Sequence, residues 1–130
     1  MKKILIICLF IIGSYVFGQS ADKEIYGCYW HVDYDVFSVI NKRKIIKIEF
    51  CNLCDNLIYI DTASYSFIND TLVFNYGLFD NSNDNYDIKW TYVDSVRFYG
   101  DGVDYLKINI GVLNEKLEVF GLQLLEIDKQ

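Results

Sequence analysis

The sequence predicts an all-β fold, either an antiparallel up-and-down barrel of about eight strands or a β-sandwich, preceded by an N-terminal signal-peptide helix. Apolar residues make up 52% of the chain and aromatic residues 17%, with 11 Tyr and 9 Phe. Aromatic and β-branched residues predominate among them, and these residue types favour strands. Turn residues separate short apolar runs every eight to twelve positions or so, the spacing typical of sandwiches and barrels. After Gln19, no window keeps apolar residues at helical spacing over three turns, so we expect no helix in the rest of the chain.

Residues 1–19 have the pattern of a secretory signal peptide. Lys2 and Lys3 precede an apolar stretch from Ile4 to Ile12, and small and polar residues follow up to Gln19. The apolar stretch is much shorter than the roughly 20 residues that a spanning helix needs. We therefore expect cleavage, a single domain over 20–130, a periplasmic or secreted location and no stable membrane span after processing. An uncleaved anchor is the alternative.

The strands are expected in the apolar runs that follow the leader. In the first run, Tyr26, Cys28, Trp30, Val32 and Tyr34 occupy alternate positions, so we expect them to share one inward face. Three tight turns are predicted between runs, at Asn69-Asp70, Asp101-Gly102 and Asn114-Glu115, because Asn, Asp and Gly tolerate positive φ. The predicted strands cover 25–34, 36–40, 44–50, 57–61, 63–68, 71–76, 86–93, 95–99, 103–110 and 116–127.

The charge of the chain argues against nucleic acid as a partner. The net charge is −6, and it becomes −8 when Lys2 and Lys3 leave with the leader. Nucleic-acid binding needs a positive surface that releases counterions. One basic run exists, at Lys42, Arg43, Lys44 and Lys47, and we interpret it as a solvated hairpin end, with a docking patch for an anionic partner as the alternative.

Two segments carry a family resemblance. The first strand opens with Gly27 and Trp30, and a later strand pair contains Tyr65, a polar Asn69-Asp70 turn and Leu72. This resembles the small lipocalin-like (calycin-type) proteins exported by Gram-negative bacteria, over nearly the whole chain after the leader. The sequence departs from that pattern because two residues, not one, separate Gly27 from Trp30.

The resemblance implies a barrel whose apolar interior binds a small hydrophobic ligand, and it carries over no catalytic residue. Aromatic residues of the predicted strands are the candidates for lining that interior, and we select Trp30, Phe74 and Trp90. Because the chain has many Phe and Tyr residues, side chains could also fill such a barrel completely.

Two cysteines in one hairpin connection, Cys51 and Cys54, are close enough in sequence for a disulfide. A bridge from Cys28 to one of them, free thiols and a metal site are the alternatives. Zinc would use Cys28, His31, Cys51 and Cys54, but residues 28 and 31 of a regular strand project to opposite faces. We therefore predict a Cys51–Cys54 disulfide and no metal site.

The loop 80–87 alternates Asp80, Ser82 and Asp84 like the start of a calcium loop, but Asn85 replaces the glycine that such a loop requires. We interpret it as a polar loop, with a weak surface cation site as the alternative.

The sequence has no nucleophile motif and no phosphate-binding glycine loop, so we expect neither an enzyme nor a cofactor. The expected function is that of an exported binding module for a small hydrophobic ligand. The alternative is a non-catalytic envelope interaction protein, with a solid barrel or sandwich that contacts another envelope protein or a glycan.

Overall fold

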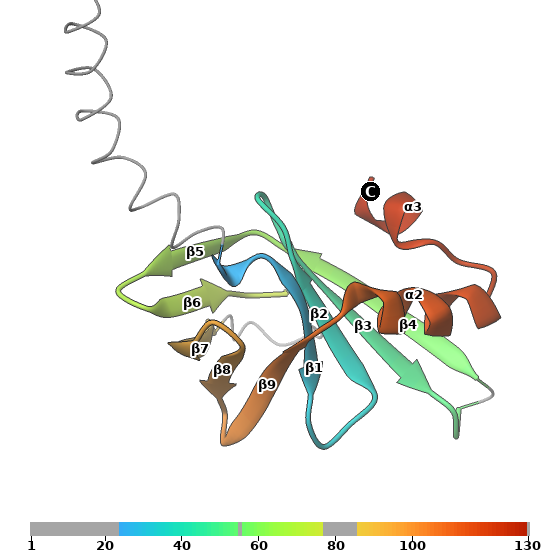
Figure 1. Cartoon of the computed structure of the whole chain (residues 1–130), viewed down its shortest axis with the longest axis horizontal. Coiled ribbons are helices and arrows are strands. Elements are labelled where there is room, and N and C mark those ends of the chain that lie inside the picture. Colours follow the sequence, from blue (N-terminus) through green and yellow to red (C-terminus); the bar gives the residue numbers. More distant parts are fainter. Residues whose placement is uncertain (1–23, 55, 77–85, 130) are drawn as a thin grey trace, which may run out of the picture.

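The computed structural model describes residues 24–54, 56–76 and 86–129. Over these ranges the chain forms an antiparallel, nearly closed barrel of nine strands, followed by helices near the C-terminus (Figure 1). The predicted signal peptide over 1–19 lies outside the described residues. The elements are β1 (Gly27–His31), β2 (Val36–Ile40), β3 (Ile45–Cys51), β4 (Leu57–Ala63), β5 (Tyr65–Ile68), β6 (Thr71–Phe74), β7 (Ile88–Asp94), β8 (Arg97–Gly100), β9 (Val103–Ile108), α2 (Ile110–Val119) and α3 (Leu124–Asp128).

The nine strands form one sheet in the order β4-β3-β2-β1-β9-β8-β7-β6-β5. Strands that are paired in the sheet follow one another in sequence, except that β1 pairs with β9, and every pair is antiparallel. The two outermost strands, β4 and β5, are separated only by Ser64, so one extended stretch of chain supplies both edges. The predicted up-and-down barrel is confirmed, and its opening lies beside β4, which pairs with β3 alone.

Two of the three predicted turns are confirmed by their backbone angles. Asn69 and Asp70, between β5 and β6, have φ of 50° and 62°. Asp101 and Gly102, between β8 and β9, have φ of 51° and 77°. Left-handed conformations at both central residues match the right-handed twist of a two-residue hairpin.

The predictions for the C-terminal quarter are wrong. The strand predicted over 116–127 is replaced by α2 and α3, and Asn114 lies within α2 instead of in a turn. Asn109 caps α2 by accepting a hydrogen bond from the backbone N–H of Gly111 at 2.8 Å. Leu113 and Leu117, one helical turn apart, are both completely buried.

The predicted inward face of the first strand also needs correction. Cys28 and Trp30 pack with α2 and α3 on the outer face of the sheet, while Tyr29 points into the barrel. Tyr34 lies beyond the end of β1 and is exposed. Tyr26, just before β1, packs against the inner core as predicted, whereas within β1 the alternation was assigned to the wrong side of the strand.

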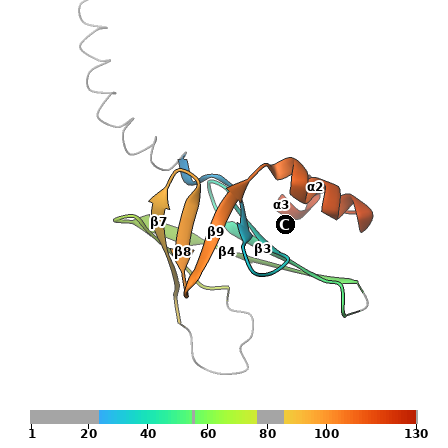
Figure 2. The same ribbon diagram turned by 60° about the horizontal axis from the view of Figure 1, so that its bottom comes forward.

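The helices cover the outer face of β1 to β4 (Figure 2). Lys116 of α2 donates hydrogen bonds to both carboxylate oxygens of Asp35, at 2.8 and 3.1 Å. At the other end of this layer, the side-chain amide of Asn41 donates a hydrogen bond to a carboxylate oxygen of Asp128 at 2.6 Å. The ammonium group of Lys44 donates to the backbone carbonyl of Asp128, also at 2.6 Å. Part of the basic run interpreted as a solvated hairpin end therefore anchors α3.

In the part of the chain that the structure describes, no helix is both long and apolar enough to cross a membrane.

Candidate ligand site in the barrel interior

Aromatic side chains dominate the interior of the barrel, and Trp90 of β7 is in contact with several of them. Its ring stacks on Tyr105 with centroids 3.9 Å apart and meets Phe74 edge-on at 5.0 Å. Phe98 lies 6.1 Å away and packs edge-on against Tyr29. Residues on three other strands thus place aromatic rings around one indole, because inward positions alternate along each strand.

Two polar atoms of this interior are buried without a hydrogen-bond partner, the indole Nε1 of Trp90 and the hydroxyl of Tyr76. Trp90 is only 3% exposed. The Ser38 hydroxyl is close to Tyr76, and the hydroxyl of Tyr105 is close to Nε1, but neither contact has the geometry of a hydrogen bond. Buried Tyr and Trp usually find a partner, so each of these donors is left in need of an acceptor.

Burial and the neighbouring Asp61 and Tyr105 raise the pKa of Tyr76, an effect that Ser38 partly opposes. The phenol therefore stays protonated at physiological pH and can act as a donor. The site thus offers donors at two points among apolar rings.

Charged side chains lie on the part of β3 and β4 that faces the opening of the barrel. Lys47 is 3.8 Å from Glu49 and 5.8 Å from the centroid of the Tyr76 ring, and it lies opposite Asp61 in the strand register. Burial raises the pKa of Asp61, Lys47 lowers it, and Glu49 raises it again. The site is therefore apolar at Trp90 and charged toward its open side.

The structure brings together two of the three residues selected from the sequence. Phe74 and Trp90 share the inner core, whereas Trp30 packs in the outer core and donates its Nε1 hydrogen to the carbonyl of Tyr34 at 2.9 Å. Tyr76 and Tyr105 were not predicted as site residues. Tyr76 lies two residues beyond Phe74, and this period-two spacing was the signal that could have found it.

The predicted disulfide is present, and it joins Cys51 and Cys54 across 5.3 Å between Cα atoms. The alternative bridge from Cys28 is not formed, because Cys28 is a buried free cysteine. Burial raises the pKa of its thiol to about 12, which keeps the thiol protonated. Cys28 and His31 point to opposite faces of the sheet, and the described residues contain no cluster suited to a metal ion. The candidate calcium positions Asp80 to Asn85 lie outside the described residues.

No family model, curated protein or solved structure matches the chain. The likeness to lipocalin-like proteins therefore rests on the antiparallel, nearly closed barrel.

Proposed function

We propose that the protein is an exported, lipocalin-like binding protein. Its barrel takes a small, largely apolar molecule that carries a hydrogen-bond-accepting oxygen. The observation that supports this most strongly is the buried, unpartnered Nε1 of Trp90 within a cluster of aromatic rings. An unmade hydrogen bond at a buried group costs roughly 1–3 kcal/mol, so a ligand oxygen that accepts from it would bind favourably.

The hydroxyl of Tyr76 adds a second donor, and the aromatic faces of Phe74 and Tyr105 provide apolar surface. Small-molecule sites commonly combine mostly apolar walls with a few directed polar groups. Both donors require an acceptor, which favours a carboxylate or carbonyl oxygen over an amine at the polar end of the ligand. Lys47 lies near the Tyr76 ring, beside the acidic Glu49 and Asp61.

Export is the second part of the proposal. The leader-like pattern of residues 1–19 supports it, and the Cys51–Cys54 disulfide is compatible with an oxidising compartment. The intact mass of the protein recovered from the cell envelope and from the medium, with a thiol count after denaturation, tests processing. Cleavage after about residue 19 and one free thiol are expected; an uncleaved chain in the membrane fraction would contradict cleavage of the leader, and an uncleaved chain in the cytosol would contradict export.

The ligand proposal is tested by titrating the protein with decanoate while Trp90 fluorescence is recorded. A Trp30→Phe background leaves Trp90 as the one remaining tryptophan, because the chain has only two. Decanoate should change the fluorescence saturably, whereas decyltrimethylammonium, which has an alkyl chain of similar length but no acceptor, should bind at least about tenfold more weakly.

Variants of the same protein locate the polar end of the ligand. Tyr76→Phe should weaken decanoate binding about tenfold through loss of one hydrogen bond to a charged group. Tyr99→Phe is the matched control, since Tyr99 is an exposed tyrosine of β8. Equal binding of the two amphiphiles, or equal effects of the two variants, would overturn the proposed site.

A further inference from the structure

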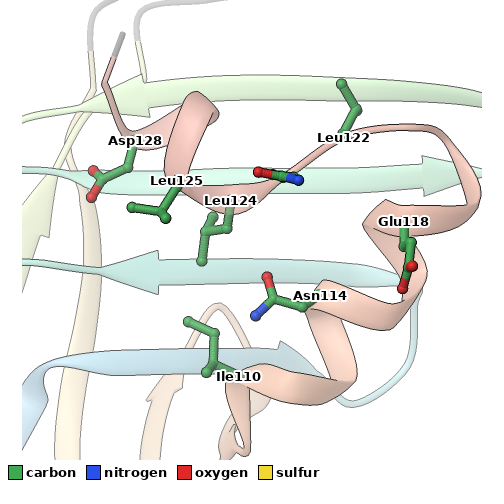
Figure 3. A pocket seen from close by; sticks show the side chains of 8 residues that line it. Ile110, Asn114, Glu118, Leu122, Leu124, Leu125 and Asp128 are labelled. Carbon is green, nitrogen blue, oxygen red and sulfur yellow. The ribbon is translucent and has the colours of Figure 1, made fainter.

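A separate groove lies on the helical side of the molecule, outside the barrel. It has a volume of about 420 Å³ and is bounded by α2, by α3 and by the segment that joins them (Figure 3). Its aliphatic lining consists of Ile110, Leu122, Leu124 and Leu125. Leu125 is 71% exposed and Ile110 is 39% exposed, so apolar surface remains open to solvent in this groove.

The fold of the C-terminal segment builds this groove. Leu113 and Leu117 bind α2 to the sheet, which leaves the adjacent ridge of Ile110, Asn114 and Glu118 facing the groove. Gly121 has φ of 72° just after α2, and the backbone N–H of Leu122 donates to the carbonyl of Leu117 at 3.0 Å. This helix-ending motif turns the chain back toward the sheet.

The opposite wall is held in place by α3. Ile127 is buried in the outer core, while Leu124, Leu125 and Asp128 line the groove. The bonds from Asn41 and Lys44 to Asp128 tie this helix to the β2–β3 hairpin. Both walls are therefore anchored to the sheet, which reduces the ordering needed when something binds.

The charge of the groove selects the kind of partner. Glu118 and Asp128 lie at opposite sides of the pocket, with Leu124 and Leu125 between them (Figure 3). The other polar residues that line it are the neutral Asn114 and Gln123, so no basic side chain is among the lining residues. Asp128 lies 3.7 Å from Lys44, whereas Glu118 forms no ion pair with any described residue.

We propose that this groove binds an extended segment of another protein in which two basic side chains flank aliphatic residues. The aliphatic side chains cover Leu124 and Leu125, and the two cations approach Glu118 and Asp128. An acidic rim around an apolar centre disfavours anionic lipid surfaces and acidic peptides by like-charge repulsion. Because the groove lies outside the barrel, this inference does not depend on the ligand proposed for the interior.

The test is a titration of the ¹⁵N-labelled protein with the peptide Ac-Lys-Leu-Leu-Lys-NH₂, followed by amide chemical shifts. Saturable shifts should be confined to residues 110–128, and the acidic counterpart Ac-Glu-Leu-Leu-Glu-NH₂ should produce none at the same concentration. Binding should weaken as salt is added. Shifts in the barrel strands instead of the helices, or equal binding of the acidic peptide, would overturn the proposal.

Charge-reversal variants separate the groove from the general acidity of the protein. Glu118→Lys should weaken binding of the basic peptide at least about fivefold. Glu115→Lys is the matched control, because Glu115 is an exposed residue of the same helix that does not line the groove. Leu125→Ala, at an exposed position, should also weaken binding without altering the fold. Equal weakening by both lysine variants, or tight binding of the protein to phosphatidylglycerol vesicles, would contradict a groove for basic peptide segments.

Discussion

The two faces of one sheet bury different kinds of side chain. The inner core of the barrel contains Tyr29, Phe74, Trp90, Phe98 and Tyr105. The outer core, beneath α2 and α3, is largely aliphatic, although Phe37 and Phe50 belong to it. The inner aromatic rings come from β1 and from β6 to β9 and meet inside the barrel. On the outer face, Leu113, Leu117 and Ile127 of the helices pack on branched aliphatic residues of the sheet such as Ile46 and Ile48.

The difference is also visible along single strands. In β2 and β3, consecutive residues are buried on opposite faces, as at Val39 and Ile40 or at Ile45 and Ile46. In β8, buried Phe98 is followed by exposed Tyr99. The sequence of a strand that is covered on both faces is a nearly continuous run of apolar residues, whereas apolar and polar residues alternate in a strand that is covered on one face. The helices therefore change the sequence requirements of the first strands but not of β8.

The largest expected effect is from truncating the inner core. Phe98→Ala should lower the free energy of unfolding by about 3–5 kcal/mol, because Phe98 is completely buried among aromatic rings. Denaturant unfolding followed by circular dichroism measures the change. Tyr99→Ala, on the opposite face of the same strand, should cost less than about 1 kcal/mol. Similar losses at the two positions would show that β8 is not buried on one face only.

Truncation of the outer core should cost slightly less and act locally. Leu117→Ala should lower the free energy of unfolding by about 2–5 kcal/mol, since Leu117 is fully buried beneath α2. Hydrogen exchange should accelerate first at the amides of α2, while those of β6 to β8 stay protected. Val119→Ala, which alters an exposed residue of the same helix, is the control and should change stability by less than about 0.5 kcal/mol. Uniform loss of protection would mean that the two cores unfold together.

A methyl group added to the inner core tests how tightly it is packed. At Gly100, a Cβ would lie 2.6 Å from a ring carbon of Trp90 and 2.8 Å from the backbone carbonyl oxygen of Lys89. Gly100→Ala should therefore destabilise the protein by about 1–3 kcal/mol and shift the Trp90 fluorescence. The control is Gly102→Asn, which should change stability little, because Gly102 has open space around it and Asn tolerates its φ of 77°. An unaltered melting temperature for Gly100→Ala would show that Trp90 and its neighbours shift without cost to accommodate the added methyl group.

The smallest effect concerns the charged side of the barrel and depends on pH. Because burial raises the pKa of Asp61 above its ordinary value of 3.8, ionisation of Asp61 disfavours the folded state. The wild-type protein is free of this cost below pH 3.8 and loses stability as pH rises through the raised pKa. Asp61→Asn should therefore raise the melting temperature at pH 7 and leave it unchanged near pH 3. Glu115→Gln is the control, and a lower melting temperature for Asp61→Asn at pH 7 would mean that attraction to Lys47 outweighs burial.

Much of the fold could be predicted because its signals are local. The turns at Asn69-Asp70 and Asp101-Gly102 depend on residues that tolerate positive φ, and the structure has positive φ at all four. The Cys51–Cys54 disulfide follows from two cysteines in one hairpin connection. The helices were missed because Lys116 to Phe120 alternates almost like a strand. The Asn109 cap and the pair Leu113 and Leu117 were present as weaker signals.

Half of the candidate site could be predicted in the same way. Phe74 and Trp90 were found as inward aromatic residues, but Trp30 was selected with them and lies in the outer core. Tyr76 matters because its hydroxyl is buried without a hydrogen-bond partner. The surroundings of this hydroxyl include Ser38, Asp61 and Tyr105, which come from strands far apart in the sequence. No local pattern contains that information.

The sequence alone determined that the chain forms short antiparallel strands in a barrel or a sandwich and where two of its tight turns lie, and it favoured the pairing of Cys51 with Cys54. Each of these depends on neighbouring residues and on an alternation that repeats every two positions. Only the tertiary structure decided which face of each strand points inward, because this alternation has the same form for both faces. Packing of α2 and α3 against one face makes that side a second core and leaves Tyr29, Phe74 and Trp90 to the barrel interior.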